Sequence, residues 1–132
     1  MPQRIQMSRQ RPWRADHPDA VVVARPSRWG NPFKVGARYL TRTYWHRAPS
    51  PDVMGRDEGS TYDSWGSDQQ IVARVRDRAH AVELFRAWVT YHDDVWTPER
   101  LTPLTGRDLA CWCPLDEPCH ADVLLDLAKR GA

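Results

Sequence analysis

The sequence predicts an α/β fold: a single domain, residues 1–132, with a small parallel or mixed sheet and covering helices. Two short apolar runs, 20–24 and 109–113, each have the composition of a buried strand. A long segment of helical periodicity separates them, and a shorter one follows the second run. Strands joined through helices favour a parallel or mixed sheet over a series of hairpins. The chain length also fits one domain.

The first 16 residues are interpreted as a basic N-terminal arm. Four arginines precede the first acidic residue, Asp16, and they are Arg4, Arg9, Arg11 and Arg14. A solvated tail is the favoured interpretation, and contact with nucleic-acid phosphates is the alternative. The net charge of the whole chain is only +2, so its overall charge does not require a nucleic-acid partner.

Residues 41–67 are predicted to form a long loop or flap because they are rich in Ser, Thr, Gly, Pro and Asp. The segment also carries large aromatic residues, which could pin it to the domain or contact a ligand. Ser67 and Gln70 then match a capping box. Apolar residues recur at helical spacing after them, so a long helix is expected over 68–91, with its arginines on a solvated face.

The last third of the chain is predicted to contain three elements. Thr97 and Pro98 resemble a helix start, and Pro103 and Gly106 end this helix soon afterwards. A strand at 109–113 follows, and a closing helix over 119–129 completes the domain. Lys129 lies at the end of that helix, where the helix dipole favours a positive charge.

The composition places the protein in a reducing cytoplasm and away from the membrane. No apolar run approaches the roughly 20 residues that a membrane span needs, and the N-terminus lacks the apolar core of a signal peptide. The three cysteines are odd in number and close together, unlike a disulfide framework. Walker, GxGxxG, HExxH and GxSxG patterns do not occur in the sequence.

The loop that follows the first predicted strand, residues 25–33, is a candidate binding segment, here called the arginine loop. Arg25 and Arg28 offer planar guanidinium groups that suit phosphate or carboxylate. Trp29 offers a face on which a base or sugar ring can stack. Gly30 and Asn31 allow a tight turn that brings backbone amides close to a ligand. In the alternative interpretation, the tryptophan fills the core and the arginines pair with acidic residues.

A second candidate segment follows the second predicted strand and is here called the cysteine segment (111–120). Cys111, Cys113, Cys119 and His120 have the donor types of a tetrahedral zinc site. Their spacing argues against one, because Cys111 and Cys113 are separated by a single residue and Cys119 adjoins His120. The favoured interpretation therefore assigns no metal and treats Cys111 and Cys113 as small buried hydrophobic residues.

Cys119 and His120 lie at the predicted start of the closing helix, where free amides and the helix dipole lower a thiol pKa. They are therefore the candidate catalytic pair, with Cys119 as nucleophile or His120 as acid or base. Asp122, in the first turn, and Trp112 are further candidate ligand contacts. In parallel sheets, ligands bind beyond the carboxyl ends of the strands, so the arginine loop and the cysteine segment are expected to share one edge.

These segments also carry a family resemblance. RPSRWGNPF near the start, AVELFRAWV in the middle and GRDLACWCPLDEPCHADVLLDL near the end make the sequence similar to the uncharacterised bacterial and phage family called domain of unknown function 4326. The resemblance covers most of the chain and implies no activity or cofactor. Residues 41–67 are longer than expected for a minimal member.

The leading functional hypothesis is binding of, or action on, a small phosphate-bearing ligand such as a nucleotide or nucleoside derivative. Arg25 and Arg28 would hold the anion, and Trp29 or Trp112 would stack on the base or sugar ring. A zinc-stabilised nucleic-acid-binding module that uses the N-terminal arm is one alternative. A protein-interaction accessory protein that uses residues 41–67 is another. The sequence leaves open whether the protein is an enzyme.

Overall fold

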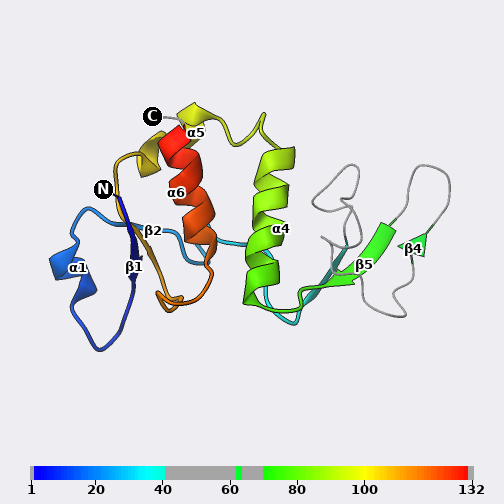
Figure 1. The fold of residues 1–132 in the computed structure, drawn as a ribbon, viewed down its shortest axis with the longest axis horizontal. Coiled ribbons are helices and arrows are strands. Elements are labelled where there is room, and N and C mark those ends of the chain that lie inside the picture. The colour runs from blue at the N-terminus through cyan, green and yellow to red at the C-terminus, as the bar shows by residue number, and fades with distance from the viewer. Residues whose placement is uncertain (1, 41–61, 64–69, 131–132) are drawn as a thin grey trace.

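The computed structural model describes residues 2–40, 62–63 and 70–130, and it contains an open parallel sheet (Figure 1). Strand β6 (Leu109–Cys111) lies between β1 (Arg4–Gln6) and β2 (Val21–Val22), and both neighbours run parallel to it. The register pairs Ile5 and Val22 with Ala110. This confirms the predicted α/β fold with a small parallel sheet.

Part of the predicted N-terminal arm is an edge strand of this sheet. Ile5 and Met7 are buried in the core, and the amide of Met7 donates to the carbonyl of Cys111 at 2.8 Å. A short helix, α1 (Trp13–Asp16), follows. The interpretation of residues 1–16 as a solvated arm is therefore wrong for residues 4–7. Two apolar residues at alternate positions are enough for an edge strand, although arginines surround them.

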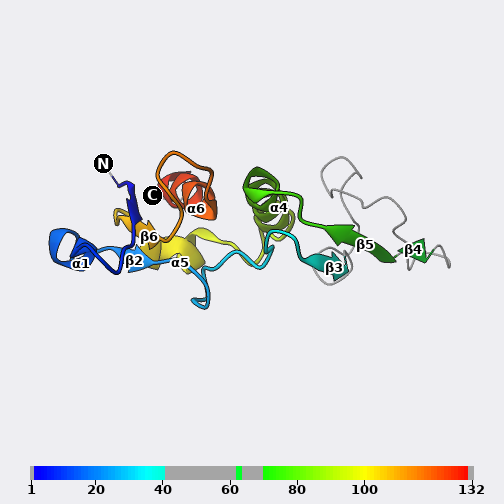
Figure 2. The same cartoon turned by 90° about the horizontal axis from the view of Figure 1, so that it is seen from below.

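One helix lies against the sheet, and a second lies beside the first (Figure 2). Helix α6 (His120–Arg130) contacts β1 and β6 on one side and α4 (Arg78–Tyr91) on the other. Helix α5 (Pro98–Leu101) and the 3-10 turn Thr102–Leu104 contact α6 further along. The apolar residues between these elements include the fully buried side chains of Val23, Leu84, Phe85, Leu104, Leu109 and Leu124.

The long helix predicted over 68–91 is wrong at its start, where a five-residue strand precedes a helix of 14 residues. Strand β5 (Gln70–Arg74) pairs antiparallel with β3 (Arg38–Leu40) and β4 (Tyr62–Asp63) in a second sheet. Helix α4 begins only after Asp77, whose carboxylate accepts from the His80 amide at 2.8 Å. Pairing with β3 satisfies the backbone of β5, and Asp77 supplies the N-cap that was assigned to Ser67.

The remaining predicted elements are close to their observed bounds. Thr97 caps α5, and its hydroxyl accepts from the Arg100 amide at 3.3 Å. Strand β6 ends at Cys111, two residues earlier than predicted. The long loop predicted over 41–67 lies outside the described residues, apart from β4. Among the helices that the structure describes, none has the length and apolar character needed to cross a membrane.

Candidate functional site

The arginine loop and the cysteine segment meet at a cavity of about 410 Å³. The cavity lies where β2 and β6 end, which is the edge at which parallel sheets bind ligands. The first turns of α4 and α6 contribute the other walls. Its lining residues are Ala24, Arg25, Asn31, Phe33, Lys34, Val35, Arg78, Ala81, Val82, Cys111, Trp112, Cys113, Pro118, Cys119 and His120.

The two arginines of the arginine loop have different positions. Arg25 lines the cavity, and its Nη1 donates to the carbonyl of Asn31 at 2.8 Å. Arg28 is also exposed, but it does not line the cavity and lies over the ring of Trp29, 4.6 Å from the centroid. The structure therefore brings one of the two predicted anion ligands to the site.

The other residues proposed for this loop hold it in place. Trp29 is only 3% exposed, packs against Trp96 and does not line the cavity, as in the alternative interpretation of a core residue. The Asn31 amide nitrogen donates to the carbonyl of Ala81 at 3.0 Å, which joins the loop to α4. A Cβ at Gly30 would lie 2.9 Å from Cγ of Arg25, so glycine is needed for the close approach of these two residues.

Two basic residues of the site were missed by the sequence analysis. Lys34 follows the arginine loop directly, and Arg78 is the first residue of α4. Arg78 was assigned to a solvated face because the helix was started ten residues too early. Its guanidinium pairs with the carboxylate of Glu117 at 3.0 Å, and both side chains are about half exposed. Among the described residues that line the cavity, three are basic and none is acidic.

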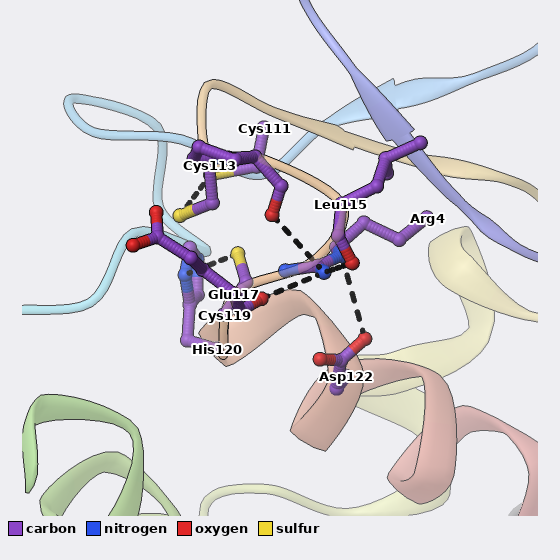
Figure 3. A network of polar contacts seen from close by, with 9 residues as sticks. Arg4, Cys111, Cys113, Leu115, Glu117, Cys119, His120 and Asp122 are labelled. Atoms are coloured by element: carbon purple, nitrogen blue, oxygen red, sulfur yellow. Dashed lines mark hydrogen bonds and ion pairs between the residues drawn. The ribbon is translucent and has the colours of Figure 1, made fainter. Parts of the chain in front are cut away.

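The floor of the cavity is a cluster of thiols and one imidazole, which Figure 3 shows facing one another. The Sγ atoms of Cys111 and Cys113 lie 3.8 Å apart, and Cys119 Sγ lies 3.7 Å from Nδ1 of His120. The donor atoms of Cys111, Cys119 and His120 all lie within 4.8 Å of one another. Spacing in the sequence argued against such a cluster, but the turn at 114–118 returns Cys119 to the end of β6.

The thiols of the cluster exchange hydrogen bonds that move their pKa values in opposite directions. Hydrogen bonds with Cys113 and then Cys119 lower the pKa of Cys111, against the effect of burial. The hydrogen bond with Cys111 is the main cause that raises the pKa of Cys113. The pKa of Cys119 is lowered: its bond with Cys111 raises it, but bonds with Cys113, His120 and the Ala121 backbone outweigh this. The cluster therefore favours the thiolate form at Cys111 and Cys119 and the thiol form at Cys113.

His120 is fixed from two sides. Its Nε2 lies 2.8 Å from the carbonyl oxygen of Val23, which accepts only from a protonated nitrogen. The neutral ring then carries its proton on Nε2 and keeps a lone pair on Nδ1, the atom that faces Cys119. Phe85 packs edge-on against the ring, and His120 is only 5% exposed. The ring therefore presents Nδ1 to the thiols.

Arg4 was assigned to the arm, but it holds the cysteine segment against the sheet (Figure 3). Its Nη2 donates to the carbonyls of Leu115 and Glu117 at 2.9 and 2.8 Å and lies 3.4 Å from that of Pro114. Its Nε lies 3.6 Å from a carboxylate oxygen of Asp122. Asp122 itself does not line the cavity, and its observed partner is Arg4.

Trp112 is the remaining predicted ligand contact. It follows β6, lines the cavity and is 48% exposed, and Arg9 lies 5.7 Å from its ring centroid.

Comparison with known proteins gives one match. The profile of a family described as a domain of unknown function, DUF4326, matches residues 5–130 of the chain. No curated protein and no solved structure matches it. The matched range contains both segments that build the cavity. The chain therefore belongs to the DUF4326 family, a family described only as a domain of unknown function.

Proposed function

We propose that the cavity binds a small phosphate-bearing molecule, such as a nucleotide or a nucleoside derivative. The observation that carries this proposal is the charge of the lining: Arg25, Lys34 and Arg78 are basic, and the described lining contains no carboxylate. A cavity of about 410 Å³ also has the size of a small-molecule site, which typically measures about 300–1,000 Å³.

The basic groups can engage a phosphate at small cost. Arg25 is exposed, and its guanidinium has N–H groups besides the one that it donates to Asn31. Arg78 pairs with Glu117, but this pair is half exposed and contributes little to stability. A phosphate can therefore replace the Glu117 carboxylate as the partner of Arg78. Bidentate contacts of arginine with phosphate are stronger than a single surface ion pair.

Trp112 supplies the apolar part of the proposed site. It lines the cavity and about half of its surface is exposed, so a base or sugar ring can cover it without displacing core residues. Cys119 and His120 form the floor and are almost fully buried. The proposal is one of binding and includes no covalent step at Cys119. The free cysteines fit the reducing cytoplasm of a bacterial or phage-infected cell, where we place the protein.

A matched pair of arginine variants tests this proposal. Arg25 and Arg28 are exposed residues of the same loop, and only Arg25 lines the cavity. Isothermal titration of the full chain with pyrophosphate, AMP and adenosine should show binding of the first two and weaker or no binding of adenosine. Loss of a hydrogen bond to a charged group costs about 1.5–3 kcal/mol, so Arg25→Gln should weaken AMP binding about 10- to 100-fold.

Arg28→Gln should leave AMP affinity within about twofold of the parent chain, since a surface change away from the site alters little. Equal losses in the two variants would show that the anion is bound by the general surface charge. Absence of binding for both pyrophosphate and AMP would refute a phosphate-binding cavity for these ligands.

The two alternative functions stay predictions. The nucleic-acid hypothesis needs a free basic arm, yet Arg4 binds the cysteine segment, so this contact does not favour it. The protein-interaction hypothesis depends on residues 41–67, nearly all of which lie outside the described residues. A salt-dependent affinity for DNA or RNA would support the first, and a partner lost on deletion of 45–60 would support the second.

A further inference from the structure

We infer that Cys111, Cys113, Cys119 and His120 form a tetrahedral site for a zinc ion at the floor of the cavity. The inference does not depend on the proposed phosphate site, because it concerns different donor atoms and a different ligand. It is based on the distances between these atoms and on the orientation of the imidazole.

Two separations between the donor atoms match the edges of a zinc tetrahedron. With Zn–S bonds of about 2.3 Å, two thiolate ligands at the tetrahedral angle lie about 3.8 Å apart. A sulfur and a nitrogen ligand lie about 3.6 Å apart on the same reasoning. The observed separations are 3.8 Å between Cys111 and Cys113 and 3.7 Å between Cys119 and Nδ1 of His120. Both edges therefore fit before any ion is placed.

The four donors also converge from two separate pieces of backbone. Cys111 ends β6, Cys113 follows it, and Cys119 with His120 opens α6. Cys111, Cys119 and His120 form one group within 4.8 Å, and Cys113 adjoins it through its 3.8 Å contact with Cys111. Figure 3 shows the sulfur atoms turned toward a common centre. Thiols that served only as apolar filling would not need this convergence.

The histidine has the orientation of a metal ligand. Zinc-binding imidazoles usually donate their second N–H to a carbonyl or carboxylate, which fixes the tautomer and directs the other nitrogen to the ion. Nε2 of His120 lies 2.8 Å from the carbonyl oxygen of Val23, and Nδ1 faces Cys119. Val23 follows β2, so the same contact connects this strand with α6.

Four protein ligands describe a closed, structural zinc site. The ion would join the end of β6 to the start of α6 and so hold two walls of the cavity together. Three thiolates and one zinc ion carry a net charge of −1. The three basic side chains of the lining exceed that charge, so the cavity stays positive when zinc is bound.

Native mass spectrometry of the full chain, purified without chelator and with zinc in the medium, tests the site. One zinc per chain is expected, and Cys113→Ser, at the half-buried position, should lower zinc occupancy at least tenfold. His17→Gln is the matched histidine control and should keep one zinc, because His17 pairs with Asp108 away from the cavity. Full occupancy in Cys113→Ser would overturn the four-ligand site.

A measurement on the unmodified chain keeps the test independent of the folding of any variant. Cobalt(II) exchanged into the zinc-free protein should give the intense visible bands of a tetrahedral thiolate site, and one equivalent of zinc should abolish them. Pale octahedral cobalt, or a folded chain that takes up less than one equivalent of either metal, would overturn the inference. Failure of this test leaves phosphate binding intact, and failure of AMP binding leaves the metal result intact.

Discussion

Replacement of Arg4 by methionine should destabilise the protein far more than replacement of any arginine on a solvated tail. The side chain of Arg4 is only 8% exposed, and its Nη2 donates at 2.8 and 2.9 Å to two carbonyls of the cysteine segment. Hydrogen bonds from a charged group contribute about 1.5–3 kcal/mol each. Two of them give a gross value of about 3–6 kcal/mol by this measure.

Three features reduce that value. Water can replace Arg4 at the carbonyls of Leu115 and Glu117, since both residues are exposed. Nη1 of Arg4 is buried and has no hydrogen-bond partner among the described residues, so its removal relieves a desolvation penalty. Methionine also retains much of the apolar contact of the arginine stem. We therefore expect Arg4→Met to lower the free energy of unfolding by about 2 kcal/mol.

Urea unfolding, followed by tryptophan fluorescence, measures this difference. Arg11→Met is the control, because Arg11 is an exposed arginine of the same N-terminal segment. Its change should stay within about 0.5 kcal/mol. The two variants should have equal m-values if both unfold in two states. A loss for Arg4→Met as small as that of the control would refute the view that Arg4 anchors the cysteine segment.

Three further predictions concern the helix start, the arginine loop and the cavity wall. Asp77→Ala removes the N-cap of α4 and should lower the free energy of unfolding in urea by about 1 kcal/mol. Glu83→Ala, on the exposed face, should change it little, and equal effects would contradict the observed helix start. Gly30→Ala places a Cβ 2.9 Å from Cγ of Arg25 and should lower the free energy of unfolding by about 1–3 kcal/mol and weaken AMP binding. An unchanged melting temperature would show that the loop adjusts without cost and would contradict this prediction. Trp112→Ala should weaken AMP at least about fivefold and pyrophosphate much less, since stacking contributes about 1–3 kcal/mol per base; equal losses would exclude stacking.

The sequence predicted the parallel sheet because two of its three strands, β2 and β6, come from short apolar runs. The valine run before the arginine loop and the LAC run before Trp112 are short, apolar and bounded by turn residues. Strand β1 was not predicted because Ile5 and Met7 lie among arginines. Their alternate positions indicate a strand only when the pairing with β6 is known. Propensity alone cannot detect an edge strand of three residues.

The start of α4 was wrong for a related reason. Apolar residues at 71, 72 and 75 fit a helix as well as a strand, and β3, one of the two antiparallel partners of β5, lies more than 30 residues away. Because the helix starts at Arg78, that residue lines the cavity. The error in secondary structure therefore also removed a basic residue from the predicted site.

The candidate site was predicted at the level of segments and less well at the level of residues. Two loops that follow parallel strands share an edge by topology, and their meeting needs no further information. Which side chains point into the cavity depends on turns within each loop. Arg25 and Trp112 face it, whereas Trp29 turns into the core against Trp96. Donor spacing in the sequence likewise gave no measure of the distance between Cys119 and Cys111.

The most direct test of the account is a titration of the isotopically labelled chain with AMP, followed by two-dimensional 1H–15N NMR. Indole N–H and arginine Nε–H signals report on the side chains that the structure separates. The account predicts saturable shifts at Trp112 and Arg25, with those of Trp29 and Arg28 unchanged. Shifts that do not saturate, or that fall on Arg28 and Trp29 instead of Arg25 and Trp112, would contradict a phosphate-binding cavity between the arginine loop and the cysteine segment.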